Sequence, residues 1–333
     1  ARGLPGRGTT SAAGIGPEPS VDRSVVRPYF DLGARYAGPK ADSLTGPSEA
    51  IALEYRPSDR HVFFAGLLVN GIGYDGGPLY PPPTGDFSFE PAPADGAVLE
   101  VELWIAAGTD ALRLPTPSGY VPEAGSLRFN GAGISLGGSD RGLVVVELGS
   151  RSGGRLVYRC VPGRLIGDDG GGRWPRLPPE VADRAREIAA MPRDLRASEV
   201  VAYVRRRVAY DASAATAERH RRAERRGLGL FERSLAVGAG DCDVQNALVA
   251  AMLEAAGVPA RLAVGWAGRS GRVAPALHAW AEYLNGDGQW WVVDASGEPA
   301  TGRVAEPGRS EPQATAAGVV TRRLGLWGVL AAT

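Results

Sequence analysis

The sequence predicts an α+β fold, in which an all-β, sandwich-like region precedes a region of mixed helices and strands. Two observations support this prediction. Between residues 49 and 166, short stretches with strand-like patterns are separated by Gly- and Pro-rich turns, which is typical of a β-sandwich or small barrel. Between residues 242 and 294, a helical pattern is followed by a strand hairpin, which predicts a helix packed on an antiparallel sheet.

The clearest strand of the first region is 97–105, where the odd-numbered residues are apolar while Glu100 and Glu102 lie on the opposite face. Further strands are expected at 50–55, 61–69, 142–148 and 155–160. This region shows no catalytic cluster. We interpret His61 as an isolated strand or surface histidine, and Cys160 as a small buried apolar residue.

The expected domain organisation follows from changes in composition. Residues 1–48 should be disordered or extended, 49–166 a β-sandwich-like domain, 167–176 a Gly- and Asp-rich linker, 177–305 a second domain and 306–333 a tail. In the tail, Arg322 and Arg323 precede a short apolar run. That run is either the start of a truncated transmembrane helix or a short helix docked on the domain.

Two helices are expected at the start of the second domain, over 177–190 and 197–207. The three consecutive arginines 205–207 are interpreted as a solvated helix face. Segment 212–229 is rich in Arg and polar throughout. We interpret it as a loop near the functional site, either mobile or able to bind acidic substrate groups.

Cys242 begins a third helix, because apolar residues recur at helical spacing through 244–255 and the pattern stops at Gly257. A helix N-terminus favours a thiolate, but only by ~0.3–1 kcal/mol at an exposed site. Asp241 and Asp243 flank the cysteine, and their negative charges raise the thiol pKa. A reactive Cys242 therefore needs a cationic partner, and a histidine is the expected one.

His278 is the candidate partner, on the first strand of a hairpin predicted over 277–284 and 289–294. Asp294 ends the second strand, close to where the first strand begins. In an antiparallel pair, directly opposed residues point to the same face. Asp294 lies on the same face as His278 only if the residue numbers of each directly opposed pair add to an even total. The loop that connects the two strands must then contain an odd number of residues.

Four short motifs follow one another in this part of the chain: Gly240-Asp241-Cys242, Gly257-Val258-Pro259-Ala260-Arg261, His278-Ala279-Trp280-Ala281-Glu282 and Trp291-Val292-Val293-Asp294. Together they resemble the transglutaminase-like superfamily, over roughly residues 178–300. The resemblance implies a papain-like core with Cys242 as nucleophile, His278 as general base and acid, and Asp294 orienting the imidazole. Many members carry Ala or Ser where this chain has Asn246, and we interpret that departure as bearing on substrate choice.

The same resemblance implies that Cys242 attacks an amide carbonyl and forms a thioester, with its own backbone N–H as an oxyanion donor. Asp241, Asp243 and Trp280 are the further candidates for the oxyanion site or the surrounding cleft. If water resolves the thioester, the protein is a peptidase or amidase, which we favour. If a lysine amine resolves it, the protein cross-links, and a catalytically idle binding or scaffold module is the remaining alternative.

Net charge and cysteine count limit the classes of partner and cofactor that this protein can have. The formal net charge is +0, which argues against nucleic acid or an anionic membrane surface as a partner. Two cysteines exclude a disulfide-rich scaffold and a Cys-based zinc site, and we expect no cofactor and no metal. The expected partner is a protein or peptide substrate. The architecture resembles bacterial membrane proteins with an extracytoplasmic transglutaminase-like domain, which favours a membrane-associated location outside the cytoplasm, tethered through tail 306–333.

Overall fold

The structure is a computed structural model that describes residues 38–39, 53–82, 89–91, 98–105, 107–140, 142–148, 153–165 and 171–297. Most of the N-terminal segment 1–48 and the whole tail 306–333 lie outside these residues, so the predictions for them stay predictions. Within the described ranges, no helix is both long and apolar enough to cross a bilayer.

Antiparallel strands make up the N-terminal half, as the alternating pattern predicts. They are β1 (Leu53–Arg56), β2 (Val62–Val69), β3 (Gly71–Ile72), β4 (Leu79–Tyr80), β5 (Phe89–Pro91), β6 (Leu99–Ile105), β7 (Ala111–Arg113), β8 (Thr116–Pro117), β9 (Tyr120–Pro122), β10 (Arg128–Phe129), β11 (Ala132–Gly133), β12 (Leu136–Asp140), β13 (Leu143–Glu147) and β14 (Gly154–Leu165). On β6, the buried residues alternate with more exposed ones, as predicted. Strands β12, β13 and β7 form a separate three-stranded sheet.

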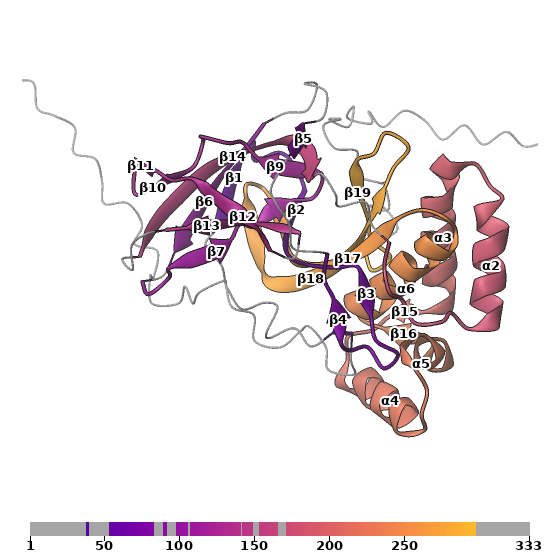
Figure 1. The fold of residues 1–333 in the computed structure, drawn as a ribbon. Coiled ribbons are helices and arrows are strands. Elements are labelled where there is room, and N and C mark those ends of the chain that lie inside the picture. The colour runs from indigo at the N-terminus through magenta and orange to yellow at the C-terminus, as the bar shows by residue number, and fades with distance from the viewer. Residues whose placement is uncertain are drawn as a thin grey trace, which may run out of the picture.

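The C-terminal half contains the helices and a second set of strands. They are α2 (Pro179–Ala189), α3 (Arg193–Arg207), β15 (Ala209–Tyr210), α4 (Ala214–Arg225), α5 (Leu230–Val237), β16 (Ala239–Gly240), α6 (Cys242–Ala255), β17 (Ala260–Arg269), β18 (Arg272–Leu284) and β19 (Trp290–Val293). Figure 1 shows these helices gathered on one side of the molecule, with most of the N-terminal strands on the other and the short strands β3 and β4 beside the helices. The predicted α+β fold class is confirmed.

One large antiparallel sheet runs through both halves (Figure 1). The hairpin of β17 and β18 lies near its centre, β2 pairs with β17, and β1 meets β18 through Glu54 and Arg272. The strands of the N-terminal region thus extend the same sheet that carries His278. Strand pairing does not show whether either half folds alone, and the division at 167–176 stays a prediction.

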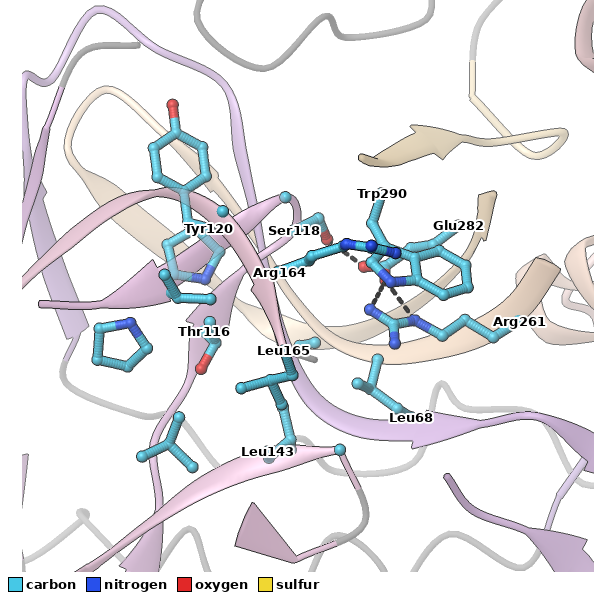
Figure 2. Close-up of a pocket in the computed structure, with 18 residues that line it drawn as sticks. Leu68, Thr116, Ser118, Tyr120, Leu143, Arg164, Leu165, Arg261, Glu282 and Trp290 are labelled. Carbon is cyan, nitrogen blue, oxygen red and sulfur yellow. Dashed lines mark hydrogen bonds and ion pairs between the residues drawn. The ribbon is translucent and has the colours of Figure 1, made fainter. Parts of the chain in front are cut away.

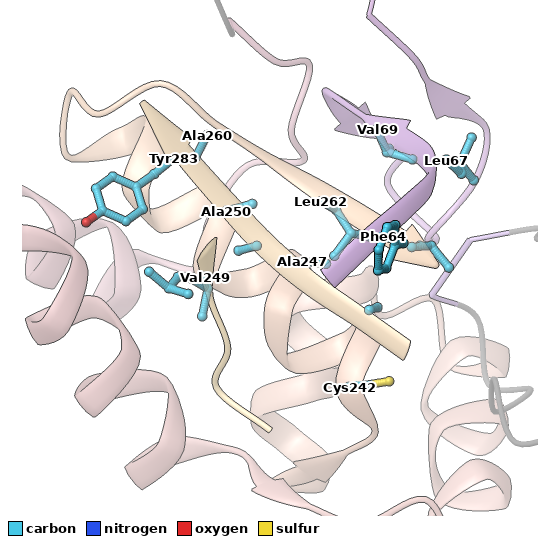
Figure 3. Packing of buried hydrophobic residues seen from close by; sticks show 14 of the residues in the cluster. Phe64, Leu67, Val69, Cys242, Ala247, Val249, Ala250, Ala260, Leu262 and Tyr283 are labelled. Carbon is cyan, nitrogen blue, oxygen red and sulfur yellow. The ribbon is translucent and has the colours of Figure 1, made fainter. Parts of the chain in front are cut away.

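The two faces of this sheet bury different groups. One face of β17 and β18, which includes Leu262, Val264 and Ala279, belongs to the main core with α6 (Figure 3). Helix α6 is buried along nearly its whole length, from Cys242 to Leu253. The opposite face carries His278 and Trp280 and packs toward β2 and β13. Helix α6 therefore covers one face of β17 and β18, and β13 of the three-stranded sheet lies over part of the other face.

Two local predictions were wrong. Segment 212–229, predicted as a loop, contains helix α4, because Ser213 caps its first turn and Glu218 links three following arginines. The first strand of the hairpin, predicted over 277–284, starts earlier, because β18 runs from Arg272 to Leu284. Ser270 and Gly271 both have positive φ, and this two-residue turn lets β18 begin at Arg272.

Candidate active site

Cys242 lies at the first position of α6 and is only 5% exposed. Asp241 occupies the N-cap position, yet its side chain makes no capping hydrogen bond. The first N–H groups of the helix therefore have no side-chain cap. The backbone N–H of Cys242 is consequently a suitable donor to an oxyanion that forms beside the sulfur.

The thiol of Cys242 is held in its neutral form. Burial raises its pKa well above the ordinary value, and the negative charges of Asp243 and Asp241 raise the pKa further. The backbone N–H of Ala279 hydrogen-bonds the sulfur and lowers the pKa, but it does not compensate for burial. Burial, which the sequence argument did not include, is thus the largest of these effects, and it acts on the thiol pKa in the same direction as the two carboxylates.

His278 and Asp294 form a short hydrogen bond, with 2.7 Å between Nε2 and Oδ2. Ala281 pairs with Val293, so the paired numbers add to an even total, and the loop 285–289 has an odd number of residues. This is the register that the facing of His278 and Asp294 requires. The sequence argument from strand parity is therefore consistent with the structure.

Asp294 is ionised and fixes the tautomer of the imidazole. Burial raises its pKa, but hydrogen bonds from His278, Ser296 and Asn246 outweigh burial and lower the pKa to about 2. An ionised carboxylate only accepts hydrogen bonds, so Nε2 of His278 carries the proton. The other ring nitrogen, Nδ1, then holds a lone pair that can accept a proton. Among the described residues, no hydrogen bond joins His278 to Cys242 in this resting arrangement.

Asn246 connects the segments that carry the three residues. Its Nδ2 lies 2.9 Å from the carbonyl oxygen of Cys242, from the carbonyl oxygen of Ala279 and from Oδ1 of Asp294. Its Oδ1 accepts a hydrogen bond of 2.9 Å from the N–H of Ala295. The side chain is fully buried behind Asp294. Its amide is therefore committed to the framework of the site, and the interpretation that Asn246 bears on substrate choice stays a prediction.

The loop after β19 is fixed from a second side by Arg205. Its guanidinium donates to the carbonyl oxygens of Asp294, Ala295 and Gly297 at 2.8–3.0 Å. The prediction of a solvated arginine face was therefore wrong for Arg205. The backbone around Asp294 is clamped by a residue that lies 89 positions earlier in the chain.

The N-terminal strands contribute an aromatic group next to His278. The ring of Phe63, on β2, lies 6.0 Å from the ring of His278 and 5.1 Å from that of Trp280. His61 packs on Phe63 at 4.8 Å, and burial, Arg269 and His278 lower its pKa. His61 is exposed, as expected of a surface histidine, but it is not isolated, because the pairing of β2 with β17 brings it onto Phe63 beside the site.

The remaining cleft candidates have different surroundings. Asp241 is 6% exposed and Asp243 is fully buried, and both act on Cys242 through their charge. Trp280 is also fully buried, and its Nε1 donates to Glu282 and Ser118, which removes the indole from the oxyanion donors. No group of His, Cys, Asp or Glu in the described part of the chain is arranged to hold a metal ion.

A cavity of about 40 Å³ is lined by residues that include Ser118, Glu282 and Trp290 (Figure 2). Its wall includes the ion pair of Arg261 and Glu282, with Nη2 to Oε2 at 2.7 Å. Glu282 also accepts hydrogen bonds from Ser118 and Trp280, and Arg261 stacks 3.8 Å from the ring of Trp290. This volume has room for a few water molecules but not for a substrate residue. Arg261, Glu282 and Ser118 thus form a buried polar cluster that connects β17, β18 and the residue that follows β8.

Comparison with known protein families adds to this geometry. Residues 181–295 match the transglutaminase-like superfamily, and the match contains Cys242, His278 and Asp294. This part of the chain is a transglutaminase-like core. No curated protein sequence matches the chain.

The likeness to solved structures covers more of the chain than the transglutaminase-like core. The periplasmic domain of TgpA from Pseudomonas aeruginosa superposes with a TM-score of 0.51 at 12% identity, covering 78% of this chain and 92% of that domain. The same domain bound to ethylmercury gives a TM-score of 0.48 at 16% identity, covering 76% and 91%. At this identity the likeness concerns the fold. Because the coverage exceeds the transglutaminase-like core, the likeness extends into the N-terminal strands.

Proposed function

We propose that this protein is a cysteine enzyme that acts on amide bonds of peptides or proteins through a thioester on Cys242, with hydrolysis as the favoured outcome. The observation that carries the proposal is the short bond between His278 and an ionised Asp294, beside a thiol at a helix N-terminus. The match of residues 181–295 to the transglutaminase-like superfamily supports the same chemistry.

In the first step, the sulfur of Cys242 attacks the amide carbonyl carbon. Because the thiol is neutral at rest, its proton moves to Nδ1 of His278 as the S–C bond forms. Asp294 stabilises the imidazolium that results, since its carboxylate already accepts the proton on Nε2. The backbone N–H of Cys242 donates to the oxyanion. The C–N bond then breaks, His278 returns the proton to the leaving amine, and a thioester remains.

In the second step, a nucleophile resolves the thioester. His278 removes a proton from water, the hydroxide attacks the thioester carbon, and the C–S bond breaks to give a carboxylic acid and the Cys242 thiol. A lysine amine attacking the same carbon would give a new amide, which is the cross-linking outcome. The same triad can activate water or a lysine amine for attack on the thioester. An experiment must therefore show which of the two nucleophiles this protein uses.

The test incubates the protein with a library of quenched fluorescent peptides, with and without a biotin-tagged primary amine. Cys242→Ala serves as the control. We expect peptide cleavage by the wild type, none by Cys242→Ala, and little incorporation of the amine. Amine incorporation that exceeds cleavage would make the protein a cross-linking enzyme. An acyl-enzyme that never forms with any peptide would point to an idle binding module.

We also propose an extracytoplasmic location, because the similar domain of TgpA is described as periplasmic. The test joins alkaline phosphatase to the native protein at a point that follows the transglutaminase-like core. This reporter is active only outside the cytoplasm. High phosphatase activity in cells is the expected result, and an inactive but stable fusion would refute the proposed location.

A further inference from the structure

We propose that Asn246 is a positioning residue that fixes Asp294 and strand β18 relative to the nucleophile. This inference rests on the proposed function and deepens it. Asn246 lies one helical turn after Cys242, on the same helix α6. From there its side chain reaches both β18 and the loop that follows β19.

The hydrogen-bonding capacity of the Asn246 amide is fully used. An asparagine amide carries two N–H donors and one carbonyl acceptor. The donors have three oxygens within 2.9 Å, those of Cys242, Ala279 and Asp294. The carbonyl of Cys242 is the helical i−4 acceptor, so the two hydrogens serve mainly Ala279 and Asp294. The acceptor oxygen takes the N–H of Ala295.

These bonds define where the reacting groups lie. By donating to Oδ1 of Asp294, Asn246 holds the carboxylate so that Oδ2 faces Nε2 of His278. By donating to the carbonyl of Ala279, it holds β18 against α6, where the N–H of the same residue faces the sulfur of Cys242. One amide on the helix that carries the nucleophile therefore sets the position of the strand that carries the base and of the orienting carboxylate.

Smaller or acidic side chains cannot replace this amide. A serine has a single donor and a shorter reach, so it leaves either Ala279 or Asp294 without its bond. An alanine leaves both without it and opens a cavity. An aspartate keeps the shape but removes both donors. It also brings a second carboxylate against Asp294, and such a pair shares a proton instead of holding two charges.

The test compares Asn246→Ala and Asn246→Asp with the wild type by two measurements. The first is proton NMR of the hydrogen-bonded imidazole N–H of His278, which reports the bond to Asp294 directly. The second is the rate of acetylation of Cys242 by p-nitrophenyl acetate. We expect both variants to lose or shift the imidazole signal. We also expect acetylation to slow by about 10²-fold, the size of effect that a misplaced catalytic group produces.

Asn285→Ala is the matched control for a merely structural role. Asn285 is also a buried asparagine, and its Oδ1 accepts from the N–H groups of Asp287 and Gln289 in the β18–β19 loop. This control should be destabilised but should keep the imidazole signal and the acetylation rate. If Asn246→Ala does not fold, Asn246→Ser, which retains one donor, is expected to fold and to show an intermediate rate.

The inference is overturned if Asn246→Asp and Asn246→Ala keep both the imidazole signal and the wild-type acetylation rate. Where one of these variants does not fold, Asn246→Ser takes its place in this comparison. Failure of the proposed function looks different. In that case wild-type Cys242 is not acetylated, while the imidazole signal of His278 still depends on Asn246. The NMR measurement therefore tests the positioning role without any knowledge of the substrate.

Discussion

Replacing Asp294 by asparagine should abolish most activity while leaving the shape of the site intact. Oδ1 of Asp294 accepts from Asn246, from the N–H of Ser296 and from the hydroxyl of Ser296. In Asp294→Asn, the amide oxygen must occupy this position, because an NH₂ group there would face donors. The amide NH₂ then faces Nε2 of His278. This nitrogen must become the acceptor, and the ring proton moves to Nδ1.

The size of the effect follows from this change of tautomer. With a proton on Nδ1, His278 cannot accept the proton of the Cys242 thiol, and the neutral thiol has no other base beside it in the proposed mechanism. The matching substitution in a serine protease triad lowers kcat by about 10⁴-fold. A factor of ~10⁴ corresponds to about 5 kcal/mol of transition-state stabilisation. We therefore expect acetylation of Cys242 to slow by about 10⁴-fold.

The assay follows p-nitrophenolate release from p-nitrophenyl acetate, with the acetylated residue located by peptide mass spectrometry. Nitrogen NMR of His278 reports which ring nitrogen carries the proton. Asp287→Asn, an isosteric change in the loop of the same hairpin, is the control and should react at the wild-type rate. If Asp294→Asn acetylates within about tenfold of the wild type, or keeps the proton on Nε2, the tautomer argument fails.

Three further predictions concern stability and reactivity. Arg261→Met leaves Glu282 buried without its ion-pair partner, so urea titration should show a free energy of unfolding about 3–5 kcal/mol lower than in the wild type. A loss below about 1 kcal/mol would contradict the importance of this ion pair for stability. Iodoacetamide should leave native Cys160 unmodified, because the side chain is fully buried and burial raises its pKa, and peptide mapping that finds fast modification there would contradict this. The lowered pKa of Asp294 should add roughly 2 kcal/mol of stability above about pH 4, which is lost as the pH falls toward 2 and is absent in Asp294→Asn, as acid unfolding curves would show.

The sequence was sufficient where chemistry follows from local spacing. The helical pattern after Cys242 placed that residue at a helix start, and the parity argument stated the register that His278 and Asp294 need in order to share a face. The predicted start of the second strand at 289 was one residue early, because that strand begins at Trp290. Both inferences use periodicities of 3.6 and 2 residues, which strand and helix geometry dictate. The even total of paired numbers followed from the requirement that His278 and Asp294 share a face.

The sequence was insufficient where contacts join distant segments. Asn246 meets Asp294 across 48 positions, and Arg205 reaches the same loop across 89. His61 seemed isolated because nothing local indicates that β2 pairs with β17. Pairing between strands far apart in the chain depends on the packing of the whole sheet, so these neighbours emerged only from the three-dimensional structure.

The most direct test of the central claim is to locate and time the acyl group formed with p-nitrophenyl acetate, in the wild type and in His278→Ala. The account predicts an acetyl thioester on Cys242 in the wild type. It also predicts a rate at least about 10³-fold lower in His278→Ala, because the neutral thiol then lacks its base. Acetylation of Cys242 at equal rates in both proteins, or its absence from Cys242 in the wild type, would contradict the account.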